Sequence, residues 1–342
     1  MRKHLLQALT GGVALLIPLT LVASSAPASA TATPRGSKSV SVVGYSIVAG
    51  AYSQLETAFK ATPAGSGVSF NNSFGASTTQ AKDVVAGQSA DLVNFSTQPD
   101  MQLLVGAGLV SSGWKSTPVA KAEGGMVTDS LVSIVVRSGN PLKIAGWNNL
   151  VVKGIKIVTP DPISSGSARW NLLAAYESQL QQRRTPKQAN AFINALIKHV
   201  VTEPSSGSRS LTTFLAGTGN VLLAYESDAS AAIAAGKHVQ IVQPAQNLLI
   251  ENPAALTKSG AGNKSAAAFY RFIFSTEGQA IWASLRYRPT LPSIKVGTRH
   301  EFYQPKALTT IAKLGGWPAV TAKFFSPTGI ITKAEAANGY TS

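Results

Sequence analysis

Four short segments rich in glycine and serine carry the residue types that could bind an anion. They stand at residues 44–46 (GYS), 72–77 (NSFGAS), 164–167 (SSGS) and 205–208 (SSGS), each ahead of a segment with a helical pattern. Small residues let backbone N–H groups approach a ligand, serine adds a hydroxyl donor, and each helix start contributes about half a positive charge. Three such starts amount to roughly 1.5 charges, close to what a buried divalent oxyanion requires. Because serine and glycine are also typical of plain turns and N-caps, one segment alone leaves both interpretations open.

The residue patterns that catalysis would need are missing from the sequence. The four histidines are far apart and lack a nearby carboxylate pair: His4, His199, His238 and His300. No G-x-S-x-G elbow and no glycine-rich nucleotide-binding motif occurs, and the lack of cysteine excludes thiolate metal sites and cysteine nucleophiles. Glu226 and Asp228 begin a predicted helix, where acidic side chains complement the helix dipole. We therefore predict a protein that is not an enzyme and has no cofactor and no metal.

The first 30 residues have the three parts of a secretory signal. Arg2 and Lys3 form a basic start, an apolar run follows, and Ala28-Ser29-Ala30 ends the segment. We predict residues 1–30 to be a signal peptide, cleaved after Ala30, so that the protein is exported to the periplasm or to the extracellular, cell-wall space. Residues 31–39 are small and polar, and they predict a flexible N-terminal segment.

The chain is strongly basic. Its 30 lysines and arginines face 15 aspartates and glutamates, a formal charge of +15 that falls to +13 when Arg2 and Lys3 leave with the signal peptide. Such a charge attracts anionic lipid, cell-wall polymer or nucleic acid. The basic residues are scattered, however, without the interleaved aromatic residues of a nucleic-acid-binding surface. We therefore predict no nucleic-acid partner.

The elements that must position the four segments alternate along the chain as strand, loop and helix. This alternation predicts an α/β protein with parallel sheets that helices cover on both faces. The second segment is expected to be a loop over residues 71–77. We expect residues 40–128 and 251–342 to form lobe I and residues 129–250 to form lobe II, joined by a hinge of two crossings near Thr128 and Leu249.

The third segment belongs to a longer motif that is specific. Residues 159–175, TPDPISSGSARWNLLAA, closely resemble the T-P-N-P-x-x-S-G-G-A-R-W-N-x-L-A-A signature of the sulfate/thiosulfate-binding proteins of ABC importers. Supporting matches run from about residue 40 to about residue 330: VRSGNP at 136–141, SGSR at 206–209, GNVLLAYE at 219–226, ENP at 251–253, YRP at 287–289 and LGGW at 314–317.

This resemblance implies a two-lobed type II periplasmic-binding-protein fold, α/β with two mixed, mostly parallel sheets and flanking helices, that closes over a dehydrated sulfate. It also implies membrane permease subunits as partners and a monomer. The residues it places at the ligand are the Ser165 hydroxyl, the N–H groups of Gly166, Ser167, Ser77 and Ser46, a donor from Ser208 beside Gly207, and the Tyr225 hydroxyl. Three of these depart from the family pattern, which often has Asp at Ser46, Gly at Ser167 and Trp at Tyr225. Arg169 and Arg209 are expected to bond within their own loops.

A site of neutral donors binds a fully ionised anion and disfavours one that carries a proton, because that proton would face no acceptor. We therefore predict sulfate over phosphate, unless Asp161 or Glu226 points into the site and accepts the proton. Other tetrahedral oxyanions, thiosulfate, molybdate and phosphate, remain alternatives. Two other classes stay open: an exported enzyme acting on sulfate or phosphate esters, and a basic adhesion protein of the cell wall.

Overall fold

The computed structural model describes residues 38–340. The signal peptide predicted for residues 1–30, and the segment 31–39 up to Ser37, lie outside the described residues. Ser39, which we expected in that flexible segment, is the first residue of β1. In the described part of the chain, no helix is both long and apolar enough to cross a membrane.

The larger sheet has six strands in the order β2-β1-β3-β11-β4-β12. Its strands are β1 (Ser39–Tyr45), β2 (Ser69–Gly75), β3 (Leu92–Asn94), β4 (Met126–Ser130), β11 (Ile250–Leu256) and β12 (Arg288–Pro289). β2 and β3 pair with β1 in parallel, whereas β11 is antiparallel to β3 and β4, and β12 is antiparallel to β4. Every residue of β3 is buried, as expected for a central strand covered on both faces. We call this sheet and its helices lobe I.

The second sheet has five strands in the order β7-β6-β8-β5-β9, and with its helices it forms lobe II. Its strands are β5 (Val132–Arg137), β6 (Ile157–Val158), β7 (Val200–Thr202), β8 (Val221–Tyr225) and β9 (Val239–Val242). β7 and β8 are parallel to β6, whereas β5 is antiparallel to β8 and β9. The predicted fold class, two mixed sheets with flanking helices, is confirmed.

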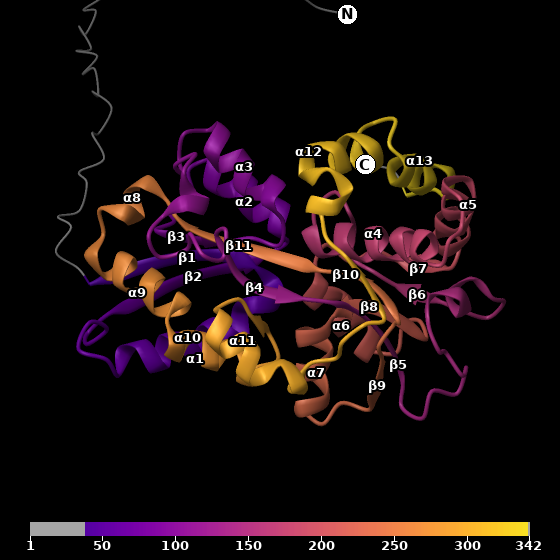
Figure 1. The fold of residues 1–342 in the computed structure, drawn as a ribbon, viewed down its shortest axis with the longest axis horizontal. Helices are drawn as coiled ribbons and strands as arrows, with labels where there is room; N and C mark the ends of the chain where they lie inside the picture. The colour runs from indigo at the N-terminus through magenta and orange to yellow at the C-terminus, as the bar shows by residue number, and fades with distance from the viewer. Residues whose placement is uncertain (1–37, 341–342) are drawn as a thin grey trace, which may run out of the picture. The chain divides into compact units, whose positions relative to one another are not determined.

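Helices cover both faces of each sheet (Figure 1). In lobe I they are α1 (Ala49–Lys60), α2 (Ser77–Val85), α3 (Gln98–Gly106), α8 (Lys258–Ala261), α9 (Lys264–Phe274), α10 (Thr276–Ser284) and α11 (Pro292–Thr298). In lobe II they are α4 (Gly166–Gln181), α5 (Pro186–Ile197), α6 (Gly207–Leu215) and α7 (Glu226–Ala234). Two further helices, α12 (Gly316–Val320) and α13 (Ile330–Ala337), follow near the C-terminus.

The chain crosses between the sheets at Leu131 and at Leu249. The first crossing lies slightly later than we expected, because Asp129 and Ser130 still pair with Glu251 and Ile250 of β11. A third passage, which the sequence did not indicate, runs through β13 (Ala307–Thr309), which pairs in parallel with β10 (Gln246–Leu248).

The C-terminal tail divides between the lobes, which corrects our assignment of all of 251–342 to lobe I. α12 and α13 pack on helices of lobe II: the Trp317 ring meets the Trp170 ring edge-on at 5.0 Å, and the Tyr340 hydroxyl donates to the Val200 carbonyl oxygen at 2.8 Å. The reason lies in α4, which is buried on nearly every side and therefore needs cover on the face away from its sheet.

Candidate anion-binding site

The four glycine and serine segments lie where strands lead into helices. β1 leads into the 3₁₀ turn η1 (Ser46–Val48), β2 into α2, the 164–167 segment into α4, and β7 into α6. The second segment differs from our expectation of a loop over 71–77. Residues 71–75 continue β2, because they pair with β1 as far as Tyr45 and Gly75. Only Ala76 separates this strand from its helix.

The helix starts present backbone donors. No N-cap side chain accepts a hydrogen bond at η1, α2 or α4. The first amides of a helix have no carbonyl partner within it, so the N–H groups of Ser46, Ser77, Gly166 and Ser167 suit an external acceptor. At α6 the Ser206 hydroxyl accepts a hydrogen bond from the Arg209 N–H at 3.3 Å, so this backbone donor at the helix start already has a partner.

Contacts between the segments bring all four together. The Thr78 N–H donates to the Ser164 carbonyl oxygen at 3.0 Å, which joins the second segment to the third. The Ser208 N–H donates to the Ser46 hydroxyl at 3.3 Å, which joins the fourth to the first. A Cβ added at Gly207 would lie 3.0 Å from the Ser167 Oγ atom, so the fourth segment also touches the third. The helix starts of both lobes therefore converge.

The Ser77 hydroxyl is already bonded within the protein. It donates to Asp100 Oδ2 at 2.7 Å and accepts from the Ser96 N–H at 2.9 Å. The Thr78 and Thr97 hydroxyls also donate to Asp100, at 2.7 and 2.8 Å. Asp100 thereby holds the start of α2 in place, and the backbone N–H is the donor that Ser77 has to offer.

Two buried hydroxyls face each other at the start of α4. The Ser165 and Ser167 Oγ atoms lie 2.8 Å apart. One of their two hydrogens occupies that bond, so the pair keeps one hydroxyl hydrogen for another acceptor.

Ser96 is a central residue that the sequence analysis missed. Its carbonyl oxygen accepts from Trp170 Nε1 of lobe II at 2.9 Å and from Asn252 Nδ2 at 3.0 Å. Its hydroxyl lies 2.7 Å from the Tyr225 hydroxyl of lobe II. A signal was present in the sequence: Leu92–Asn94 forms a strand, and Ser96 follows it just ahead of a helix that begins with proline at its second residue.

Tyr225 ends β8 and is completely buried. Burial raises the pKa of its hydroxyl, so the group stays protonated and neutral. Its ring lies 6.1 Å from the Tyr45 ring, and the Tyr45 hydroxyl donates to Asn252 Oδ1 at 3.1 Å. Tyr225 therefore holds lobe II against lobe I through Ser96, at the place where the helix starts meet.

The two carboxylates that could have accepted a ligand's proton are engaged elsewhere. Glu226 Oε2 lies 2.7 Å from Arg288 Nε, and burial raises the pKa of Glu226 although Arg288 opposes the shift. Asp161 accepts from the Ile163 N–H at 2.8 Å and from the Ser164 hydroxyl at 2.7 Å. As we expected, Arg169 bonds within its own loop: its Nε atom donates to the Pro162 carbonyl oxygen at 3.0 Å.

Comparison with known proteins adds a family and relatives. Residues 40–285 match the family described as bacterial extracellular solute-binding protein. A sulfate-binding protein of Synechococcus elongatus is 33% identical over 306 residues, which are 87% of each chain. A thiosulfate-binding protein of Escherichia coli is 28% identical over 282 residues, 80% of this chain and 82% of its own. The solved structure of the sulfate-binding protein SubI from Mycobacterium tuberculosis is similar with a TM-score of 0.80 at 39% identity, covering 84% of this chain and 99% of its own.

Proposed function

Because the chain belongs to the bacterial extracellular solute-binding protein family, we propose that it captures sulfate between its lobes for an ABC importer. The observation that carries this proposal is the convergence of the η1, α2, α4 and α6 starts, three of them without side-chain caps. The names of the sulfate-binding relatives support the choice of ligand.

The proposed ligand contacts are N–H groups at the helix starts and the hydroxyls of Ser165, Ser208 and Tyr225; the Ser208 N–H itself donates to the Ser46 hydroxyl. Hydrogen bonds from several amides and the dipoles of the helices behind them replace the water shell of a dianion without a counter-charge. The residues that would supply them are Ser46, Ser77, Ser165, Gly166, Ser167, Gly207, Ser208 and Tyr225.

Sulfate is preferred over phosphate because it carries no proton at neutral pH. A phosphate that keeps one proton needs an acceptor for it, and a buried donor left without one costs about 1–3 kcal/mol. The carboxylates of Asp161, Glu226 and Asp100 are each engaged by donors of the protein. Thiosulfate is the second candidate, favoured by the thiosulfate-binding relative.

Closure of the lobes is the signal that the importer would detect. Ligand that bonds helix starts of both lobes stabilises the state in which Ser96 contacts Tyr225 and Trp170, and membrane permease subunits can recognise that state. We further propose that the protein is exported through the signal at residues 1–30 and acts as a monomer.

Calorimetric titration with sulfate, thiosulfate, molybdate and phosphate tests the proposal. Sulfate should bind most tightly, and Ser165→Ala should weaken it by about tenfold to a hundredfold, the value of a hydrogen bond to a charged group. Ser284→Ala, which removes an exposed hydroxyl bonded only within α10, is the matched control and should bind normally. Tight phosphate binding without sulfate binding would overturn the choice of ligand.

A further inference from the structure

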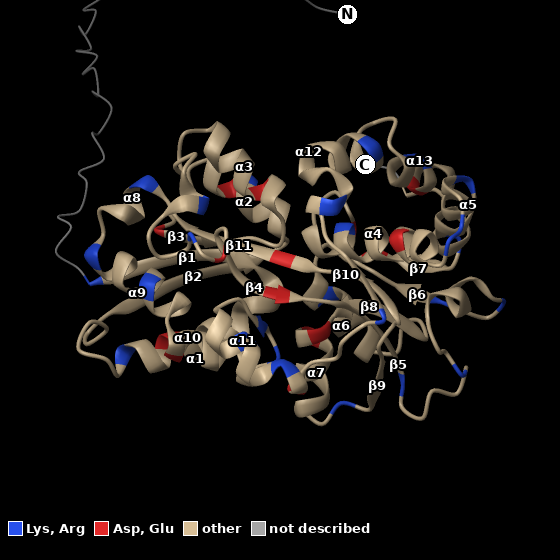
Figure 2. Cartoon of the chain, viewed as in Figure 1, with Lys and Arg blue, Asp and Glu red and all other residues tan. Residues whose placement is uncertain are grey.

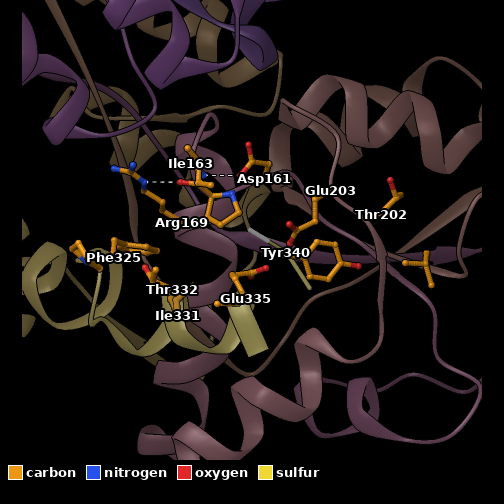
Figure 3. A pocket seen from close by; sticks show the side chains of 14 residues that line it. Asp161, Ile163, Arg169, Thr202, Glu203, Phe325, Ile331, Thr332, Glu335 and Tyr340 are labelled. Carbon is orange, nitrogen blue, oxygen red and sulfur yellow. Dashed lines mark hydrogen bonds between the residues drawn. The ribbon is translucent and has the colours of Figure 1, made fainter. Parts of the chain in front are cut away.

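A pocket lies between lobe II and the C-terminal tail, and none of the eight proposed ligand residues lines it. It has a volume of about 1020 Å³ and lies between the 161–163 loop, the end of β7, and α13. Lys and Arg are spread over both lobes (Figure 2), yet three carboxyl groups line this one pocket: Asp161, Glu203 and Glu335. Figure 3 shows Glu203 and Glu335 extending toward the same space beside Tyr340.

Glu335 is a buried carboxyl group without an N–H or hydroxyl donor. It is only 6% exposed, and neither of its carboxylate oxygens accepts a hydrogen bond from an N–H group or a hydroxyl; Oε1 of Glu203 also accepts none from such a donor. Burial raises the pKa of both glutamates. The charge of Glu335 and the hydrogen bond between the two carboxyl groups raise the pKa of Glu203 further, the same bond lowers that of Glu335, and the charge of Asp161 raises both. Two facing carboxyl groups can bond each other only by sharing a proton, so their charge is satisfied incompletely.

The arginine of this pocket does not neutralise the pair. Arg169 Nε donates to the Pro162 carbonyl oxygen at 3.0 Å, and the guanidinium lies 5.4 Å from the centre of the Phe325 ring. The remaining walls include apolar side chains such as Val201 and Ile331. Among residues 38–340, no group of three or more His, Asp or Glu side chains could hold a metal ion.

We propose that this pocket binds a small organic cation: an amidinium, guanidinium or ammonium group on an apolar body. The cation would bond Glu203 and Glu335 and displace the proton they share, while its body packs against Phe325 and Ile331. The volume suits a ligand of this kind, because small-molecule sites are mostly apolar cavities of roughly 300–1,000 Å³ with a few placed polar groups. Planar cations with two parallel N–H groups match a carboxylate especially well.

Benzamidine and benzamide form a matched pair of probes, because they have nearly the same shape and differ in charge. Calorimetry on the unaltered protein should show benzamidine binding about tenfold to a hundredfold more tightly than benzamide. Binding should strengthen from about pH 6 to about pH 9 and release a proton, detected as a dependence of the heat on the buffer's ionisation enthalpy.

Variants locate the site. Glu335→Gln should reduce benzamidine affinity by about tenfold or more, whereas Glu277→Gln, an exposed glutamate in the first turn of α10, should not change it. The thermal midpoint of each variant shows that it is folded, and sulfate titration of the same samples tests the other site separately. Equal affinity for the two probes, or unchanged binding by a folded Glu335→Gln variant, would overturn the proposal.

Discussion

A single methyl group added at Gly166 should act as a wedge between the lobes. Gly166 is the first residue of α4 in lobe II, and a Cβ placed there would lie 2.7 Å from the Ser96 Cβ and Oγ atoms and 2.8 Å from Thr97 Cγ2, both in lobe I. Side-chain carbons essentially never approach other atoms this closely. In Gly166→Ala the lobes must therefore separate by a fraction of an ångström or force the Ser96 segment to move.

The magnitude follows from the cost of overpacking. Extra carbon atoms in a well-packed region cost about 1–3 kcal/mol, and here the cost applies to the closed state because the neighbours belong to the opposite lobe. Ligand binding draws on the same closure, so sulfate affinity should fall by about 5-fold to about 150-fold. The free energy of unfolding without ligand should change little if the unliganded protein is open.

Isothermal titration with sulfate measures this loss, and urea unfolding without sulfate measures the stability of the unliganded protein. The matched control is Gly50→Ala, in α1, where an added Cβ meets nothing within 4 Å. Gly50→Ala should bind as the unaltered protein does. Unchanged sulfate affinity in Gly166→Ala would refute the reasoning, because it would mean that binding does not require the close approach of Gly166 to Ser96.

Three further predictions concern groups at or near the junction of the lobes. Burial raises the pKa of Asp228 from its ordinary value of 3.8 to about 7, so the folded protein holds a proton that the unfolded chain has lost. The contribution of Asp228 to the free energy of unfolding is greatest below about pH 4 and is lost as the pH rises to about 7. At pH 8 the Asp228→Asn variant should therefore be more stable than the unaltered protein by about 4 kcal/mol in urea unfolding. Equal stability of the two proteins at pH 8 would contradict this. Arg288→Met leaves the Glu226 carboxylate buried without its partner and should lower the free energy of unfolding by about 3–5 kcal/mol. Adding Glu226→Gln to this variant should restore most of the lost stability. If the double variant stays as unstable as Arg288→Met, the lost ion pair is not the cause. Tyr225→Phe removes the contact with Ser96 and the proposed hydrogen bond to the ligand, and it should weaken sulfate binding by about tenfold to a hundredfold in calorimetry. Unchanged or tighter binding would exclude that role of the hydroxyl.

Local residue pattern predicted much of the architecture. The helices expected after the second, third and fourth segments start at Ser77, Gly166 and Gly207. These features depend on residues close together in the chain, where β-branched runs and small residues at helix starts act directly on the backbone. The 159–175 motif also predicted the family, which the comparisons confirm.

Ser96 and the tail could not be placed in this way. Ser96 gains its position because β3 lies between β1 and β11, which brings it to Asn252, and because lobe II brings Trp170 and Tyr225 to it. Strand order and contacts between the lobes cannot be predicted from the residue type at a single position of the chain. The same holds for α12 and α13, whose apolar residues required burial but did not indicate which lobe would cover them.

Short segments of the sequence therefore determine the hydrogen-bond donors and the helix starts, since backbone amides, hydroxyls and helix dipoles are properties of a few consecutive residues. The tertiary structure determines which helix starts lie close together, which hydroxyls form hydrogen bonds within the protein, and which groups the carboxylates contact. It placed Ser77 on Asp100, turned Glu226 toward Arg288, and set Glu203 against Glu335, because each of these pairings joins distant segments through the packing of whole sheets and helices.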